Sequence, residues 1–202
     1  MTFGPAFAQG QGLPYKNQSR MKAYRRLAKR EVYRNPYLCV EVHDVVHPNG
    51  SEGEYALLVA PPASAAIVSD GGDLLFARQP RFGAQAEVIE IVKGGRDQRE
   101  SALDCAKREA REELGIQAAH WEPLGILYEI PSIVNAPVEL FLAHGIEHVE
   151  SQEDALESVD LVRVPEDAAI KAAVSGQIND AVTVAALLRY GLRRGRLRFS
   201  AP

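Results

Sequence analysis

The pattern of apolar and polar positions predicts a chain made mostly of short strands. Alternating or short continuous apolar runs predict strands at residues 38–43, 54–60, 64–69, 74–79, 87–92, 120–130, 138–146 and 159–164. Turn-forming residues separate the first two pairs of strands, Pro-Asn-Gly at 48–50 and Asp-Gly-Gly-Asp at 70–73. These turns indicate two hairpins.

Helices are predicted at three places in the second half of the chain. The clearest is 100–114, where apolar residues recur at 3-4-4 spacing: Leu103, Ala106, Ala110 and Leu114. Gly115 follows, where a left-handed C-cap belongs. Residues 166–176 and 179–192 are also helical in pattern, and Asn179 or Asp180 would cap the second. The order of elements predicts an α+β fold with a mixed sheet.

The two ends of the chain differ from the middle. Residues 1–20 contain glycine and proline with little periodicity and are expected to form a mobile tail. Residues 19–31 are basic and predict a short helix, which either contacts phosphate or membrane or is simply solvated. We therefore expect a basic N-terminal tail at 1–34, a main domain at 35–194 and a short basic tail at 195–202.

Composition narrows the class of protein. The 202 residues are 46% hydrophobic and 25% charged, as expected for one globular domain. Two cysteines cannot form a disulfide framework, which favours a cytoplasmic location. The apolar runs are shorter than the roughly 20 residues of a membrane span, so no membrane-spanning segment is expected.

Charge is distributed unevenly along the chain. The net charge is −4, yet residues 1–34 hold eight basic side chains and one acid, and residues 189–202 hold five arginines and no acid. The middle is therefore strongly acidic, which excludes a core that coats nucleic acid. The surplus acids either form a solvated surface or hold a cation.

Three of these acids fall on one helix. At 100° per residue, Glu109, Glu112 and Glu113 lie within about 100° of arc and would repel one another. Arg108 and Arg111 offset part of that repulsion, so a solvated face with intrahelical pairs is one interpretation. The other is a site for a hard cation such as Mg²⁺ or Mn²⁺, which prefers oxygen ligands.

The spacing of the surrounding residues favours the cation. The segment resembles the Nudix box at each of its fixed positions: Gly94, Glu100, Arg108-Glu109, Glu112-Glu113 and Gly115. Only Ala110 departs, since the family usually has a larger aliphatic residue there. The resemblance implies a Nudix α/β/α sandwich with a loop–helix–loop catalytic motif. It also implies a metal held by the carbonyl of Lys93 and by the carboxylates of Glu109, Glu112 and Glu113, with Glu100 and Arg108 holding loop and helix together.

The flanking sequence resembles the ADP-ribose pyrophosphatases within this family. The matching features are the strands at 37–60, the run LLFARQPRF, Glu90, Pro131 and the acidic run SQEDALESVDLVRVP. The resemblance implies Mg²⁺-dependent hydrolysis of ADP-ribose to AMP and ribose 5-phosphate, with Glu112 and Glu157 as catalytic carboxylates. Glu153, Asp154 and Asp160 are neighbouring acids; Glu153 and Asp154 are alternatives for the base.

Substrate contacts and assembly are less well defined by the sequence. Arg78 and Arg81 end a strand expected to approach the cleft, and Glu90 matches a family glutamate, so all three are candidates to bind the small-molecule nucleotide. Relatives are commonly homodimers, and the strands at 37–60 suggest the same here. Two alternatives stay open: hydrolysis of other ADP-linked compounds, nucleotide sugars, NADH or dinucleotides, and a module that senses a nucleotide without cleaving it.

Overall fold

The computed structural model describes residues 23–149 and 159–197, and the chain divides into two compact units. Unit 1 comprises residues 1–60 and 132–135, and unit 2 comprises residues 61–131 and 136–202. The tail expected at 1–20 lies outside the described residues. The described residues form strands in both units and helices in unit 2, which confirms the predicted α+β class.

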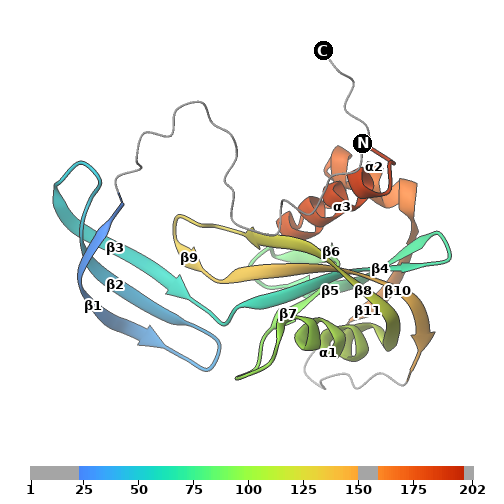
Figure 1. Cartoon of the computed structure of the whole chain (residues 1–202), viewed down its shortest axis with the longest axis horizontal. Helices are drawn as coiled ribbons and strands as arrows, with labels where there is room; N and C mark the ends of the chain where they lie inside the picture. The colour runs from blue at the N-terminus through green and yellow to red at the C-terminus, as the bar shows by residue number, and fades with distance from the viewer. Residues whose placement is uncertain (1–22, 150–158, 198–202) are drawn as a thin grey trace, which may run out of the picture. The chain divides into compact units, whose positions relative to one another are not determined.

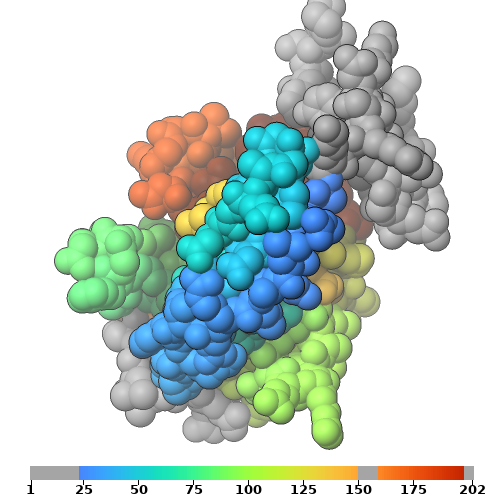
Figure 2. All heavy atoms as spheres, turned by 90° about the vertical axis from the view of Figure 1, so that its left-hand side faces the viewer, coloured from blue at the N-terminus to red at the C-terminus, as the bar shows by residue number. Residues whose placement is uncertain are grey.

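Unit 1 is a four-stranded sheet in the order β1-β2-β3-β9. Its strands are β1 (Arg25–Arg34), β2 (Cys39–Val46), β3 (Glu52–Val59) and β9 (Val134–Asn135). The first three are antiparallel, and β9 runs parallel to β3. Figure 2 shows β1 to β3, from blue to cyan, side by side at the surface.

The first strand corrects a prediction, because residues 25–34 are extended where the sequence predicts a short basic helix over 19–31. The cause is the neighbouring strands, which supply acids for the basic residues. Lys29 Nζ lies 2.7 Å from Glu41 Oε1, and Arg30 Nη1 lies 3.3 Å from Asp44 Oδ1. Pairing with β2 thus outweighs the local helical pattern.

Unit 2 contains a seven-stranded mixed sheet. Its main path is β11-β5-β4-β10-β8, with β6 paired to β5 and β7 paired to β4. Only β4 and β10 are parallel among these pairs. The strands are β4 (Ala63–Asp70), β5 (Asp73–Arg81), β6 (Ala86–Glu90), β7 (Val92–Gly95), β8 (Ile116–Tyr128), β10 (Pro137–His148) and β11 (Asp160–Pro165).

Helices cover both faces of this sheet, as Figure 1 shows. Helix α1 (Ala102–Leu114) packs on one face, while α2 (Glu166–Ser175) and α3 (Ala181–Arg193) pack on the other. Strand β5 serves both cores, because Leu74 and Phe76 face α2 and α3 whereas Leu75 and Ala77 face α1. A strand buried on both faces reads as a continuous apolar run. The predicted α/β/α sandwich is confirmed.

The strand predicted at 87–92 is divided in two. Residues 86–90 pair with β5, and residues 92–95 pair with β4. The division falls at Ile91, whose backbone N–H leaves the ladder and donates to Thr183 Oγ1 at 3.0 Å. This break directs β7 toward α1, where the glycines of the motif lie. Within the described ranges, no helix has the length and apolar character needed to cross a bilayer.

Candidate active site

Helix α1 has well-defined ends. The side chain of its N-cap, Ser101, accepts a hydrogen bond from the Asp104 backbone N–H at 3.1 Å. At the other end Gly115 adopts φ 61° and ψ 42°, and its N–H donates to the Arg111 carbonyl at 3.1 Å. These caps fix the helix beside β7 and confirm both the predicted helix and its predicted left-handed cap.

The turn before the helix lies against the first of the three glutamates. A Cβ built on Gly94 would lie 2.0 Å from Glu109 Cδ, far inside van der Waals contact. Only glycine therefore lets the Glu109 carboxylate approach the backbone of β7. This close approach explains, in steric terms, why the motif has glycine at position 94.

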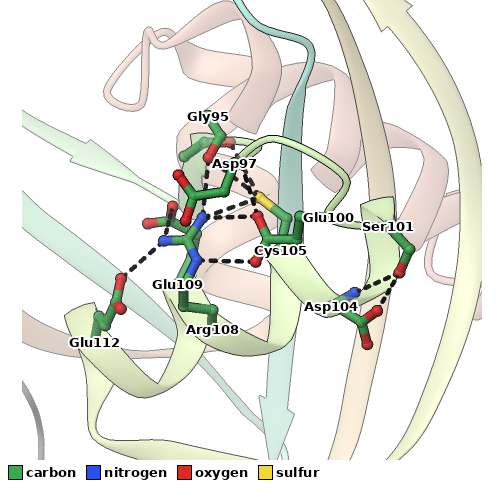
Figure 3. A network of polar contacts seen from close by, with 10 residues as sticks. Gly95, Asp97, Glu100, Ser101, Asp104, Cys105, Arg108, Glu109 and Glu112 are labelled. Atoms are coloured by element: carbon green, nitrogen blue, oxygen red, sulfur yellow. Dashed lines mark hydrogen bonds and ion pairs between the residues drawn. The ribbon is translucent and has the colours of Figure 1, made fainter.

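Arg108 connects the loop, the helix and two of the acids (Figure 3). Its Nε and Nη2 donate to the two carboxylate oxygens of Glu100 at 2.9 and 3.1 Å, and Nη2 also donates to the Gly95 carbonyl at 3.0 Å. Its Nη1 donates to Glu109 Oε1 at 2.7 Å and to Glu112 Oε2 at 2.9 Å. The structure thus gives Arg108 and Glu100 the connecting role that the resemblance implies.

These contacts shift the titration of both partners. Hydrogen bonds from Arg108 lower the pKa of Glu100, and the backbone N–H of Asp97 acts in the same direction, while partial burial opposes them. Hydrogen bonds to Glu100, with the charges of the neighbouring acids, raise the pKa of Arg108 well above its ordinary value. The pair is therefore charged throughout the neutral range.

The donor set fits a hard divalent cation. Glu109 and Glu112 converge on one guanidinium nitrogen, and carboxylate oxygens are the ligands that Mg²⁺ and Mn²⁺ prefer. Lys93 directly precedes Gly94 in β7, the strand against which Glu109 rests. In residues 23–149 and 159–197, however, no three acidic, histidine or cysteine side chains are already arranged around one ion position. Arg108 instead provides the positive charge between two of the carboxylates.

A cavity of about 430 Å³ lies in unit 2 beside the end of β6 and the start of α3. Its lining includes Arg81, Glu90, Lys93, Asn179, Asp180 and Ala181. Arg81 donates to the two oxygens of the Glu90 carboxylate at 2.8 and 3.0 Å, and Glu90 is only 3% exposed. Two of the three predicted substrate contacts therefore lie together in one cavity.

The side chain of Lys93 points into a group of acids. Its Nζ lies 3.4 Å from Asp180 Oδ1, 3.4 Å from Glu129 Oε1 and 3.6 Å from Glu90 Oε2. Burial would lower the pKa of Lys93, but the three carboxylates outweigh burial and raise it. The sequence predicts only a backbone role for Lys93, and it gives no signal that residues 93, 129 and 180 meet.

Asp180 joins this group through its position as the N-cap of α3. Its Oδ2 accepts from the Thr183 N–H at 2.8 Å and from the Thr183 hydroxyl at 2.7 Å, which confirms the predicted cap. Burial would raise the pKa of Asp180, but Lys93 and the Thr183 hydrogen bonds outweigh burial and lower it. Asp180 thus connects the start of α3 to Lys93 in the lining of the cavity.

One of the predicted substrate contacts lies outside this cavity. Arg78 Nη2 is 2.7 Å from Asp160 Oδ2 on the neighbouring β11, and Arg78 does not line the cavity that contains Arg81. Glu157 falls in 150–158, outside the described residues. The residues that flank this segment lie near α1, since the Val149 N–H donates to the Gly115 carbonyl at 2.8 Å and Val159 packs on the α1 core.

Comparison with known proteins agrees with this geometry. Residues 59–177 match the NUDIX domain, and residues 24–58 match the nucleoside diphosphate sugar hydrolase N-terminal domain. An ADP-ribose pyrophosphatase of Bacillus subtilis (strain 168) is 27% identical over 164 residues, which cover 80% of this chain and 89% of that protein.

One further relative and one solved structure are also similar to this chain. A CMP-5′-(N-acetyl-N-hydroxy-3-aminopropyl)phosphonate hydrolase of Streptomyces rubellomurinus is 29% identical over 161 residues, covering 79% of this chain and 78% of that protein. The crystal structure of an ADP compounds hydrolase shares the fold, with a TM-score of 0.76, 24% identity and coverage of 88% of this chain and 98% of that one. Because the NUDIX match spans more than half of the chain and includes the whole loop–helix–loop, the chain belongs to the Nudix family of pyrophosphatases.

Proposed function

We propose that this enzyme hydrolyses the pyrophosphate bond of a nucleoside diphosphate linked to another group. ADP-ribose is the favoured substrate, and AMP and ribose 5-phosphate are the products. The single observation that carries the proposal is the convergence of Glu109 and Glu112 on Arg108, with Glu109 seated against Gly94. The similarity to an ADP-ribose pyrophosphatase over 80% of the chain supports the substrate.

The reaction requires a divalent cation, Mg²⁺ or Mn²⁺, in this proposal. Glu109, Glu112, Glu113 and the Lys93 carbonyl would hold it. When bound, the cation neutralises phosphate oxygens and lowers the pKa of a water molecule that attacks phosphorus. The chain's own contribution is to hold the carboxylates in place, which Arg108 does through its bonds to Glu100 and Gly95.

A carboxylate must also take the proton of the attacking water. Glu112 and Glu157 are the proposed candidates, with Glu153 and Asp154 as alternatives in the same acidic run as Glu157. Glu112 is the more accessible of the two acids bound to Arg108, with 37% of its side chain exposed against 12% for Glu109. A partly exposed carboxylate is better placed to exchange a proton with water.

The cavity of about 430 Å³ is the proposed place for part of the substrate. Arg81 and Glu90 supply a paired donor and acceptor, and Lys93 adds a second cation. Paired charges of this kind hydrogen-bond sugar hydroxyls as both donors and acceptors. Arg78 stays a proposed contact, although its present partner is Asp160.

Two alternatives remain within the same proposal. The first is hydrolysis of other ADP-linked compounds, nucleotide sugars, NADH or dinucleotides, and the phosphonate hydrolase shows that relatives of similar identity differ in substrate. The second is a nucleotide-sensing module without activity. The intact set of acids disfavours the second, because loss of the carboxylates is the expected mark of a non-hydrolytic relative.

Assembly and location complete the proposal. We infer a homodimer that pairs through unit 1, because β1 is the edge of its sheet and all ten of its residues are exposed. We also infer a cytoplasmic enzyme, consistent with Cys39 and Cys105 being free thiols. Light scattering on the purified protein tests the first inference, since a monomeric mass would contradict it.

A substrate panel tests the function. The purified enzyme is incubated with ADP-ribose, ADP-sugars, NADH, dinucleotides or a CMP conjugate in Mg²⁺, and alkaline phosphatase releases phosphate from any monoester product. ADP-ribose is expected to have the highest kcat/KM. Glu113→Gln should abolish turnover, whereas Glu147→Gln, an exposed carboxylate on β10, should not change it. Turnover of none of these compounds would refute the proposal.

A further inference from the structure

A second pocket lies on α1, away from the acids. It has a volume of about 350 Å³ and is lined by Lys107, Arg108, Arg111, Gln117, Ala118 and Trp121. The first three come from α1 and the others from the beginning of β8. In helical geometry Lys107 and Arg111 each lie about 160° around the helix from Glu109. Lys107 and Arg111 therefore face away from Glu109, whereas Arg108 lines this pocket and also contacts the active-site carboxylates.

Two of its three cations have no charged or hydrogen-bonding partner among the described residues. The guanidinium of Arg108 is already bound to Glu100, Glu109 and Glu112. Lys107 and Arg111 are exposed, and within the described residues neither forms an ion pair or a side-chain hydrogen bond. Like charges four residues apart on a helix repel each other. A bound anion would relieve that repulsion and give both cations a partner.

The pocket is also lined by Trp121, whose indole is held in place by two contacts. Trp121 Nε1 donates to the Ala118 carbonyl at 3.1 Å, and its ring meets Phe141 edge-on, with centroids 6.4 Å apart and planes at 73°. Its N–H is thus already used, and what the indole offers a ligand is ring surface. Gln117 adds an amide that both donates and accepts.

We propose that this pocket binds a nucleoside monophosphate. Lys107 and Arg111 would pair with the phosphate, and Trp121 would pack on the base. The volume is at the lower end of the roughly 300–1,000 Å³ of small-molecule sites, which suits one nucleotide better than a two-part pyrophosphate substrate. The proposal concerns a site apart from the active site and does not depend on the proposed reaction.

The chain provides its own probe, because Trp121 is its only tryptophan. Intrinsic fluorescence is followed during titration of the full-length protein with AMP in EDTA, so that metal-dependent binding at the active site is suppressed. Saturable quenching is expected. Ribose 5-phosphate and inorganic phosphate test the anion alone and adenosine tests the base alone, and each should bind more weakly than AMP.

Charge variants locate the binding. Lys107→Gln with Arg111→Gln should weaken AMP binding about tenfold, which corresponds to about 1.4 kcal/mol. The matched control is Lys171→Gln, an exposed lysine on α2, which should leave the affinity within about twofold. Calorimetry with Trp121→Phe gives a reading that does not depend on fluorescence, and weaker binding is expected there too. Absence of saturable quenching, or equal affinity in the double variant, would overturn the proposal.

Discussion

Gly94 and Glu109 are packed so closely that any side chain at position 94 would occupy the place of the Glu109 carboxylate. A Cβ there would lie 2.0 Å from Glu109 Cδ and 2.0 Å from its Oε1. The glycine is thus a steric requirement of the acid's position. The relationship joins β7, which carries Lys93, to α1, which carries the three proposed carboxylate ligands.

Gly94→Ala should therefore lower both the activity and the stability of the protein. Displacing Glu109 should lower kcat/KM about 100-fold or more, because small errors in position are costly in catalysis. Overpacking should cost about 1–3 kcal/mol of unfolding free energy. Hydrolysis assays and urea denaturation measure the two effects. Gly83→Ala is the control, since nothing lies within 4 Å of a Cβ there, and full activity in Gly94→Ala would contradict the steric argument.

Arg108→Met should lower stability in a pH-dependent way. It removes charge-assisted hydrogen bonds to Glu100, which are worth about 2 kcal/mol at pH 7. Because Arg108 lowers the pKa of Glu100 below its ordinary 4.5, the stabilisation is present above that value and is lost as the pH falls through the folded-state pKa. The difference in unfolding free energy between wild type and variant should therefore shrink from pH 7 to the acid limit.

Denaturation in urea across this pH range measures the difference. Arg163→Met is the matched control, since Arg163 pairs with Asp70 at an exposed position and its loss should cost much less stability than Arg108→Met. A constant difference between Arg108→Met and wild type at all pH values would show that Glu100 is not the partner that matters.

Lys93→Ala should distinguish the role of the Lys93 side chain in substrate binding from the role of its backbone carbonyl in metal binding. The carbonyl stays, so Mn²⁺ affinity measured by electron paramagnetic resonance should be unchanged. The loss of the ammonium leaves Asp180, Glu129 and Glu90 without their shared cation, so KM for ADP-ribose should rise several-fold. For comparison, Glu113→Gln should weaken Mn²⁺ binding at least about tenfold. Loss of a residue that only supports a metal ligand already costs about tenfold or more in metal affinity, and loss of a ligand should cost no less. Loss of Mn²⁺ affinity in Lys93→Ala would contradict this division of roles.

Local patterns in the sequence predicted the elements that depend on local interactions. The 3-4-4 spacing and the caps define α1 because a helix is closed within its own segment. The hairpin of β4 and β5 followed from its glycine turn. The acidic arc of the helix and its flanking glycine likewise indicated a cation site, since each member has a fixed place in one short motif.

Features that depend on distant pairing were not predictable in this way. The local sequence pattern of β1 predicts a helix, and its ion pairs with acids of β2 and β3, which favour the strand, are not visible in that pattern. Lys93 and Asp180 are far apart in sequence, and only the packing of α3 on the sheet brings them together. The second pocket is equally hidden, because its lining combines residues of α1 with residues at the start of β8.

Thr183→Val should destabilise the protein, because it removes both hydrogen bonds of the hydroxyl, one from the Ile91 backbone N–H and one to Asp180 Oδ2. Thr183 is fully buried, and its hydroxyl accepts from the Ile91 N–H at the break between β6 and β7. Valine has the same shape but leaves that buried N–H without an acceptor, which costs about 1–3 kcal/mol. Thr183→Ser keeps the hydroxyl and loses only a methyl group, so it should cost about 0.8 kcal/mol. Urea denaturation compares the two variants, and amide hydrogen exchange at Ile91 should accelerate in Thr183→Val alone. Equal exchange rates in both variants would show that the hydroxyl does not hold the start of β7. The connection between α3 and the strand that carries Gly94 would then depend on the ion pair between Asp180 and Lys93.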